Sequence, residues 1–254
     1  MNSTALGNTG ITVSRLCFGT GTTKIDCESA QSKLPVDALG SLLVEAHRLG
    51  VTFWDTADNY NTYAHVAWAL ARLPRNEVVI TSKTHAATAV GARASLDEAL
   101  RELGTDYLDV MLLHEPDSPE EFEERRAALQ ELHKAKREGK IRSVGLSTHA
   151  ILTLEHVAGL ADIEVILTNF NVAEDHMDAG IEHYRAAMQQ AHAAGQGVVS
   201  MKTLGEGRLA HRKQETITYS LSQPFIHSVV VGMMNAHELD ENVAIAKEHL
   251  HARA

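Results

Sequence analysis

Short runs of aliphatic, β-branched and aromatic residues alternate with longer, mixed polar and apolar stretches along this chain. Each short run predicts a buried strand, and the predicted strands cover residues 15–20, 51–55, 77–83, 107–114, 141–146, 165–170, 197–203 and 226–232. Each longer stretch predicts a helix, and the predicted helices cover residues 35–49, 63–73, 90–103, 118–139, 151–160, 179–194, 212–222 and 237–251. Residues 1–14 predict a short hairpin that turns at residues 7–10.

This regular alternation predicts the fold class. Strands that alternate with helices form a parallel sheet whose faces the helices cover. Eight such units within 254 residues favour a closed (β/α)₈ TIM barrel, formed as one domain over residues 1–254. A doubly wound Rossmann fold is the main alternative, but no predicted strand leads into the G-x-G-x-x-G dinucleotide fingerprint.

Composition narrows the classes of function. The chain is 44% hydrophobic and 22% charged, which is typical of a soluble globular protein. A net charge of −10 argues against nucleic acid or anionic membrane as a partner. Two cysteines, Cys17 and Cys27, are too few for an iron–sulfur cluster or a structural zinc site, so no metal is expected. Without a signal peptide or a long apolar run, the chain is expected to be cytoplasmic, as a monomer or weak homo-oligomer.

Four titratable side chains fall at one end of the predicted barrel. Asp55, Lys83 and His114 lie at the ends of the second, third and fourth strands, and Tyr60 lies in the loop after the second. Active sites of such barrels form at the carboxyl ends of the strands. Each residue alone is compatible with a structural role, such as an ion pair between Lys83 and Asp55. All four at neighbouring strand ends favour a catalytic site.

The chemistry follows from the four side chains. A tyrosine with a pKa of about 10 donates a proton poorly at neutral pH. A nearby lysine ammonium is expected to lower that pKa, and a carboxylate keeps the lysine charged and oriented. A histidine can hydrogen-bond a carbonyl oxygen and fix its direction. The set suits proton donation to a carbonyl that is being reduced, with the hydride supplied by a bound cofactor.

These residues stand in an order found in a known family. The chain carries Asp55-Thr-Ala-x-x-Tyr60, then Lys83 on a strand, then Tyr107-x-Asp-x-x-x-Leu-His114, and this order resembles the aldo-keto reductase family. The resemblance extends to residues 6–20, 145–148, 198–208 and 232–242, and so covers nearly the whole chain. It implies an oxidoreductase that reduces an aldehyde or ketone to an alcohol. The implied cofactor is NADP(H) or NAD(H), bound extended across the barrel mouth.

The resemblance also implies residue roles. Tyr60 is the general acid, Lys83 and Asp55 tune it, and His114 orients the carbonyl. The implied cofactor-binding residues reach from the nicotinamide, through the pyrophosphate, to the adenosine: Gly19, Thr20, Ser147, Thr148, Met201, Leu204, Gly205, Arg208, Gly232, Met233, Met234, Asn235, Glu238, Glu241 and Asn242.

The chain departs from the family pattern at three places. It is shorter than most relatives, with abbreviated substrate loops, above all between the seventh and eighth strands, which predicts an open pocket. Thr148 and Leu167 replace an Asn and a Gln that commonly hold the carboxamide. Glu238 stands where an Arg often meets a 2′-phosphate.

Two other functions stay open at this point. One is a non-catalytic NADP-binding regulatory subunit, since similar proteins serve with ion channels. The other is a (β/α)₈ lyase or isomerase in which Lys83 forms a Schiff base.

Overall fold

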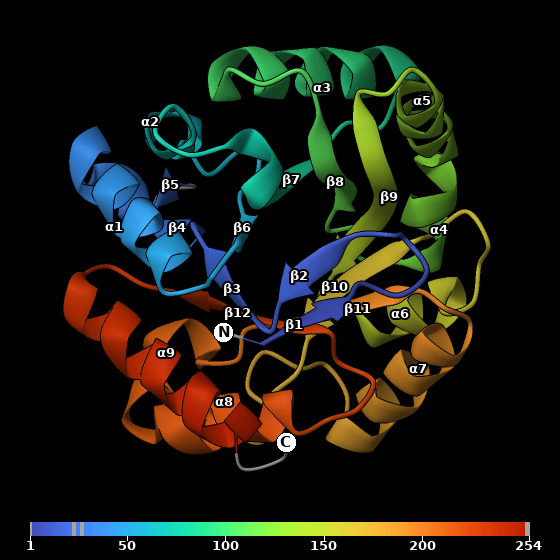
Figure 1. The fold of residues 1–254 in the computed structure, drawn as a ribbon. Helices are drawn as coiled ribbons and strands as arrows, with labels where there is room; N and C mark the ends of the chain where they lie inside the picture. Colours follow the sequence, from blue (N-terminus) through green and yellow to red (C-terminus); the bar gives the residue numbers. More distant parts are fainter. Residues whose placement is uncertain (1, 22–23, 26–27, 252–254) are drawn as a thin grey trace.

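Eight parallel strands close into a barrel in a computed structural model that describes residues 2–21, 24–25 and 28–251 (Figure 1). Each strand pairs with its neighbours in chain order, and the last pairs with the first. The barrel strands are β3 (Leu16–Gly19), β6 (Phe53–Asp55), β7 (Val79–Thr84), β8 (Leu108–His114), β9 (Ile141–Thr148), β10 (Val165–Asn169), β11 (Gly197–Met201) and β12 (Ser228–Gly232). The predicted TIM barrel is confirmed.

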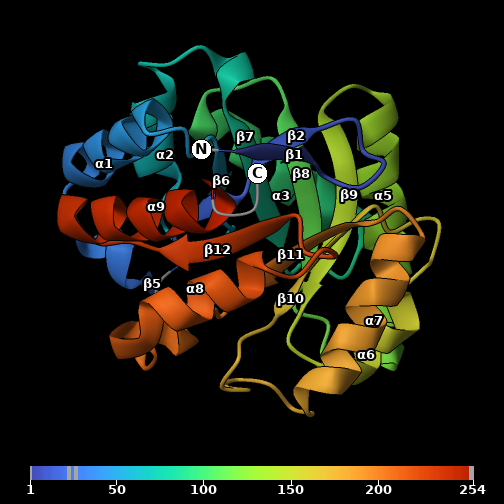
Figure 2. The ribbon, with the colours of Figure 1, turned by 60° about the horizontal axis from the view of Figure 1, so that its bottom comes forward.

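Helices surround this barrel on the outside (Figures 1 and 2). Within the described residues, none of them is long and apolar enough to cross a membrane. The helices are α1 (Val36–Arg48), α2 (Tyr63–Leu70), α3 (Ala89–Leu103), α4 (Pro119–Glu124), α5 (Arg126–Arg137), α6 (Ile151–Val157), α7 (Ile181–Ala193), α8 (Lys213–Leu221) and α9 (Ala236–His251).

The single helix predicted over residues 118–139 is wrong, because two helices, α4 and α5, occupy this stretch. Arg125 separates them, with φ −91° and ψ 7° instead of helical values. At this break the Arg125 guanidinium donates a hydrogen bond of 2.9 Å to the carbonyl oxygen of His114. The break thus ties the helix layer to the end of β8, where a predicted catalytic residue lies.

The predicted N-terminal hairpin is present and closes one end of the barrel. Its strands β1 (Ser3–Ala5) and β2 (Thr12–Ser14) pair antiparallel, and they lie across the barrel in Figure 1. Leu6, Ile11 and Val13 pack with apolar side chains from the barrel interior. Asn8 N–H donates to the carbonyl oxygen of Gly195, just before β11 begins. The hairpin therefore covers the amino ends of the strands and leaves the carboxyl ends for the site.

A second short hairpin lies in the stretch between β3 and α1. It is formed by β4 (Lys24–Ile25) and β5 (Glu28–Ser29) and is followed by a 3₁₀ helix, Ala30–Lys33. Cys27 lies outside the described residues. Gln31 Nε2 donates to the carbonyl oxygens of Gly19 and Met233, at 2.9 Å each. These bonds hold the ends of β3 and β12 together at the barrel mouth.

Strand alternation explains which side chains reach the mouth. Successive side chains on a strand point to opposite faces, so residues two apart share a face. Phe53, Val79 and Leu112 pack inside the barrel. Asp55, Lys83 and His114 lie two or four positions further along the same strands. The alternation therefore places all three on the inner face at the carboxyl ends.

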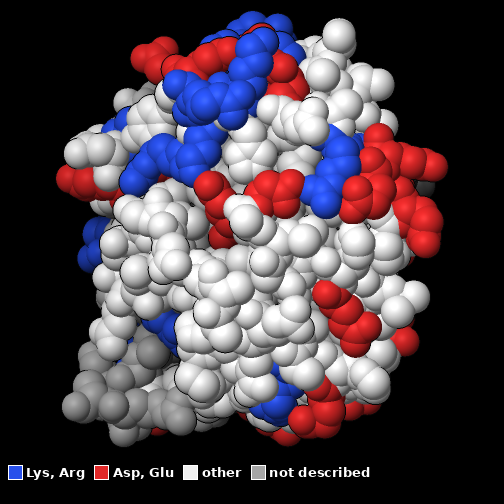
Figure 3. Space-filling model, turned by 90° about the vertical axis from the view of Figure 1, so that its right-hand side faces the viewer, with Lys and Arg blue, Asp and Glu red and all other residues white. Residues whose placement is uncertain are grey.

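Charged side chains of both signs gather on the upper part of the face in Figure 3, and the lower part is largely uncharged. Ion pairs also join neighbouring helices on the outside of the barrel. Arg93 of α3 pairs with Glu131 of α5 and with Glu138, at 2.7 Å each, and Lys140 pairs with Asp97 of α3 at 2.6 Å. These pairs link α3 and α5 along the outside of the barrel.

Candidate active site

The four predicted catalytic side chains converge at the barrel mouth. Lys83 Nζ lies 2.8 Å from Asp55 Oδ2 and 3.2 Å from Tyr60 Oη, and it also donates to the carbonyl oxygen of Thr56 at 2.9 Å. The Tyr60 ring meets the His114 ring edge-on, with 5.8 Å between centroids. Lys83 is 1% exposed and Tyr60 8%. The lysine is therefore fixed by three acceptors, and the tyrosine hydroxyl stays accessible at the mouth.

Tyr60 has room for its ring because residue 21 is a glycine. A Cβ at Gly21 would collide with the Tyr60 ring. The Tyr60 backbone is held by an N–H bond of 3.2 Å to the carbonyl oxygen of Ala57, in the turn after β6. Thr62 stands directly before α2. Its hydroxyl forms hydrogen bonds with the hydroxyls of Thr20 and Thr56, at 2.8 and 3.0 Å. A buried polar turn thus sets the position of the tyrosine.

Burial, and not Lys83, dominates the pKa of the tyrosine. Burial raises the pKa of Tyr60 to about 12, while the Lys83 charge opposes this rise. The prediction that the pKa of Tyr60 is lowered is wrong in direction, because desolvation of the phenolate outweighs the neighbouring ammonium. Tyr60 is thus protonated throughout the neutral pH range, as a proton donor must be.

The lysine is charged. Burial lowers the pKa of Lys83, but the nearby Asp55 carboxylate and Tyr60 outweigh burial and hold that pKa above its usual range. A Schiff-base lysine needs the opposite shift, because the free amine is the nucleophile. The environment of Lys83 therefore disfavours the lyase or isomerase reading.

His114 is neutral. Burial lowers its pKa to about 3, so the imidazole carries a single N–H at neutral pH. His114 is the last residue of β8, and its carbonyl oxygen accepts the hydrogen bond from Arg125 described above. A neutral imidazole can donate one hydrogen bond to a carbonyl oxygen without competing with Tyr60 as the acid.

A cavity of about 570 Å³ opens beside Tyr60 and Asp55. It extends past the ends of β11 and β12 to the first turns of α9. Asn242 Oδ1 and Thr203 Oγ1 are buried at its lining and have no hydrogen-bond partner among the described residues. Buried polar atoms normally have a partner. An elongated polar ligand, such as a dinucleotide, fits this lining.

Eight of the fifteen predicted cofactor-binding residues line this cavity: Gly19, Met201, Leu204, Gly232, Met234, Glu238, Glu241 and Asn242. The other seven are not part of its lining: Thr20, Ser147, Thr148, Gly205, Arg208, Met233 and Asn235. Several of these have other partners. Thr148 donates to the carbonyl oxygen of Pro116 at 3.0 Å, and Arg208 forms an ion pair of 2.8 Å with Asp175. Ser147 Oγ is buried without a partner among the described residues.

Two lysines line the cavity in the described part of the chain, and sequence reasoning missed the first of them, Lys202. Lys202 follows β11 directly and pairs with Glu206 at 2.5 Å, and Lys213 begins α8 and pairs with Glu241. Lys202 and Glu206 both have positive φ, of 55° and 54°. Non-glycine residues in this region carry strain, which is common at functional sites. The feature of the sequence that could have revealed Lys202 is its position at the carboxyl end of a barrel strand.

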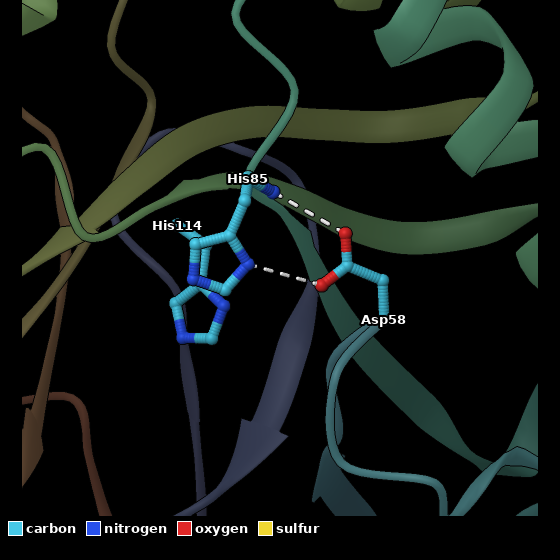
Figure 4. A group of neighbouring side chains, drawn as sticks. All are labelled: Asp58, His85 and His114. Carbon is cyan, nitrogen blue, oxygen red and sulfur yellow. Dashed lines mark hydrogen bonds and ion pairs between the residues drawn. The ribbon is translucent and has the colours of Figure 1, made fainter. Parts of the chain in front are cut away.

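Sequence reasoning also missed a group of charged side chains around His114. Asp58, His85 and His114 could hold a metal ion, since one ligand atom from each lies within 4.8 Å of the others (Figure 4). Hydrogen bonds to Asp58 and then to Glu115 raise the pKa of His85 to about 9. Without a bound metal, His85 is therefore protonated at neutral pH, and its proton supplies positive charge here. The feature of the sequence that could have revealed this group is the position of His85 and Glu115 next to the ends of β7 and β8.

Residues 15–220 match the family model described as Aldo/keto reductase family. The chain belongs to the aldo/keto reductase family. A solved structure of a Pseudomonas aeruginosa protein assigned to the aldo-keto reductases is similar with a TM-score of 0.83 and 25% identity. The similarity covers 98% of this chain and 96% of that one.

Curated members of the family with sequence similarity include one dehydrogenase and two reductases. L-galactose dehydrogenase from Arabidopsis thaliana is 24% identical over 96% of this chain and 88% of its own. The NADPH-dependent alpha-keto amide reductase from Saccharomyces cerevisiae is 28% identical over 58% of this chain and 49% of its own. The NADH-specific methylglyoxal reductase from Escherichia coli is 27% identical over 70% and 61%. Both forms of the nicotinamide cofactor thus occur among the named aldo-keto reductases.

Proposed function

We propose that this protein is an NAD(P)H-dependent reductase that converts an aldehyde or ketone into an alcohol, with Tyr60 as general acid. The observation that carries the proposal is the contact of one buried ammonium, Lys83, with both Asp55 and Tyr60 beside a long cavity. Membership of the aldo/keto reductase family supports it.

The four side chains divide the work of carbonyl reduction. His114 donates a hydrogen bond to the carbonyl oxygen and fixes its direction. Tyr60 donates its proton to the same oxygen as negative charge develops there. Lys83 stabilises the phenolate that remains, because its ammonium lies 3.2 Å from the hydroxyl oxygen. Asp55 compensates the charge of the buried lysine. A bound reduced nicotinamide supplies the hydride that adds to the carbonyl carbon.

The cavity residues suit a dinucleotide. Gly19, which lies opposite Asp55 in the pairing of β3 with β6, and Met201, at the end of β11, are assigned to the nicotinamide half. Lys202 and Lys213 offer cations to the pyrophosphate, and Asn242 offers an unpaired amide oxygen to the adenosine end. Phosphate oxygens must then compete with Glu206 and Glu241 for the two lysines. We assign both NADPH and NADH as acceptable cofactors.

The proposed substrates are small, reactive carbonyl compounds bound with weak KM. Short connections around the mouth leave few residues to enclose a substrate, and enclosure supplies most of the apolar contact in a ligand site. A bulky ketone with a Kd below roughly 1 μM would need about 8 kcal/mol of contacts. Binding of such a ligand would contradict the open pocket.

Two measurements on the purified protein test the proposed function. Fluorescence titration with NADPH and with NADH measures cofactor binding. A panel of small aldehydes, dicarbonyls and ketones is then screened by the loss of reduced-nicotinamide absorbance. Tight cofactor binding without turnover of any carbonyl would instead favour a regulatory subunit. Trapping of a substrate on Lys83 by borohydride would favour Schiff-base chemistry.

A further inference from the structure

Glu115 lies directly after His114 and turns back toward it. Neighbouring residues on a strand point to opposite faces, so the next side chain would normally point away from His114. Glu115 instead has a positive φ of 54°, in the left-handed region that non-glycine residues rarely adopt. Its N–H donates to the carbonyl oxygen of Ser147 at 2.9 Å, which fixes this turn at the end of β9. The turn breaks the alternation and places the carboxylate beside the imidazole.

The Glu115 carboxylate contacts three imidazoles. Its Oε1 lies 2.9 Å from His149 Nε2 and 3.4 Å from His114 Nε2, and its Oε2 lies 3.7 Å from His85 Nε2. Partial burial raises the pKa of Glu115, but the bonds from His114, His149 and His85 outweigh burial and hold that pKa well below its usual range. Glu115 is therefore an ionised acceptor at neutral pH.

This contact decides where the single proton of neutral His114 lies. A carboxylate can only accept a hydrogen bond, so the ring nitrogen that faces it carries the hydrogen. That nitrogen is Nε2. Nδ1 is buried and has no partner among the described residues, so nothing there holds a proton. The Nε2–H form therefore has its single donor on the side of the ring that Glu115 contacts.

His85 and Asp58 support the carboxylate from the other side. The His85 ring lies against the His114 ring, with 4.2 Å between centroids and a tilt of 43°. Asp58 bonds both the backbone N–H and Nδ1 of His85, at 3.2 and 3.3 Å, and so holds the ring in place (Figure 4). His85 is thus a fixed, positively charged neighbour of Glu115.

We propose that Glu115 is a positioning residue that holds His114 as the Nε2–H donor to the substrate carbonyl, with the Asp58–His85 pair holding Glu115 in turn. This rests on the proposed function, because the substrate carbonyl oxygen takes the place beside Nε2–H that Glu115 holds in its absence. The orientation of His114 is then set before the substrate arrives, which lowers the cost of forming the reactive complex.

Nitrogen NMR of the imidazoles tests the proposal without relying on turnover. The protonated and the bare ring nitrogens of a neutral imidazole have well-separated shifts, and a His114→Gln spectrum assigns the His114 signals. Wild type is expected to show His114 with hydrogen on Nε2. Glu115→Ala is expected to shift it toward a mixture of both forms, whereas Glu115→Gln keeps an acceptor oxygen and retains the Nε2–H form.

Steady-state kinetics provide the second readout. Glu115→Ala is expected to lower kcat about 10-fold, with cofactor Kd unchanged. This is less than the ~10²–10⁴-fold typical of a general acid or base itself, because Glu115 acts only through His114. Glu115→Gln is expected to keep at least a third of kcat. The control is Glu77→Ala, which removes a carboxylate 3.2 Å from His47 Nε2, in a pair outside the group around His114. Glu77→Ala is expected to change neither the nitrogen NMR signals of His114 nor kcat.

Three results would overturn the proposal. They are an unchanged His114 signal in Glu115→Ala, an equal loss of kcat in the Ala and Gln variants, and a wild-type kcat that EDTA removes and Zn²⁺ restores. The last would assign the organisation of His114 to a metal at Asp58, His85 and His114. If wild type reduces no carbonyl but the NMR shift occurs, the proposed function fails separately from the contact between Glu115 and His114.

Discussion

Two adjoining regions of the mouth are built differently: the corner formed by Asp55, Tyr60, Lys83 and His114, and the cavity that extends from it toward α9. In the corner, Asp55 and Lys83 are almost fully buried, and their ion pair stands on two neighbouring strands whose register is fixed by parallel pairing. In the cavity, Lys202 and Lys213 stand after strand β11 and at the start of a helix, and their ion-pair partners are partly exposed. The corner is fixed by burial and strand register, whereas the two lysine pairs of the cavity are partly open to water.

This difference follows from the free energy that it costs to separate a charged side chain from its partner. A buried lysine that loses its partner leaves an uncompensated charge in a low dielectric. A partly exposed pair is weak, because water and salt screen it. A buried ion pair therefore suits chemistry that needs a fixed proton donor. A partly exposed pair suits the binding of a mobile, charged cofactor.

The largest effect is expected for Tyr60→Phe. The change removes only the hydroxyl that donates the proton, and general acid catalysis is typically worth ~10²–10⁴-fold in rate. We expect kcat to fall by about this factor while cofactor Kd and the unfolding midpoint stay near wild type. Pre-steady-state kinetics with one good carbonyl substrate measure the chemical step.

Tyr63→Phe is the matched control for this change. Tyr63 is also a buried tyrosine, but its hydroxyl bonds Ser82 Oγ at 2.7 Å and is not part of the cavity lining. The control is expected to lose stability without losing the chemical step. A Tyr60→Phe enzyme that keeps more than about half of kcat, with chemistry rate-limiting, would contradict the role of Tyr60.

The second prediction separates the two regions by stability. Lys83→Met leaves Asp55 buried without its partner and is expected to cost about 3–5 kcal/mol of the free energy of unfolding. Adding Asp55→Asn removes the stranded charge and is expected to restore part of this loss. Urea unfolding at neutral pH measures all three proteins.

Lys213→Met is the control in the cavity. Lys213 and Glu241 are each about a third exposed, so loss of this pair is expected to leave the unfolding midpoint close to wild type. If Lys83→Met and Lys213→Met lose the same free energy of unfolding, the contrast between a buried and a partly exposed ion pair is wrong.

The same contrast explains what the sequence could predict. Asp55, Lys83 and His114 follow from strand ends and two-residue alternation, which the hydrophobic pattern reveals directly. The pKa direction of Tyr60 did not follow, because its burial depends on packing from Gly21 and neighbouring strands. The resemblance implies Arg208, and not Lys202, as a cofactor-binding residue, although Arg208 pairs with Asp175 and is not part of the cavity lining. Loop geometry with left-handed residues cannot be read from residue types alone.

The third prediction concerns the cofactor end of the cavity. Asn242→Leu keeps the volume of the side chain but removes the buried amide oxygen that has no partner among the described residues. Loss of one hydrogen bond to the cofactor is expected to raise Kd for reduced cofactor roughly 3- to 10-fold. Fluorescence titration measures Kd, and Asp240→Ala on the exposed face of α9 is the control. No change in Kd would place the adenosine elsewhere.

The smallest effect is expected for Glu238→Gln. Glu238 accepts hydrogen bonds from Met234 N–H at 2.8 Å and from Asn235 Nδ2 at 2.9 Å, and its own N–H donates to Asn235 Oδ1. This reciprocal pattern is close to a helix capping box, with Met234 N–H in place of the N–H of Asn235, so the carboxylate is engaged in starting α9. We expect kcat/KM for NADPH over NADH to lie within about 100-fold, or ~2.7 kcal/mol, and the substitution to change this ratio less than about 3-fold.

Steady-state kinetics with both cofactors decide this last point, because selection of a 2′-phosphate needs a cation that the capping box does not supply. Lys213 lines the same part of the cavity, where it pairs with Glu241, and it is the residue to compare. An NADPH preference above roughly 10³-fold that persists in Glu238→Gln but collapses in Lys213→Gln would identify Lys213 as the partner of the phosphate. The cavity would then be a selective cofactor site, and the proposed tolerance for both cofactors would be wrong.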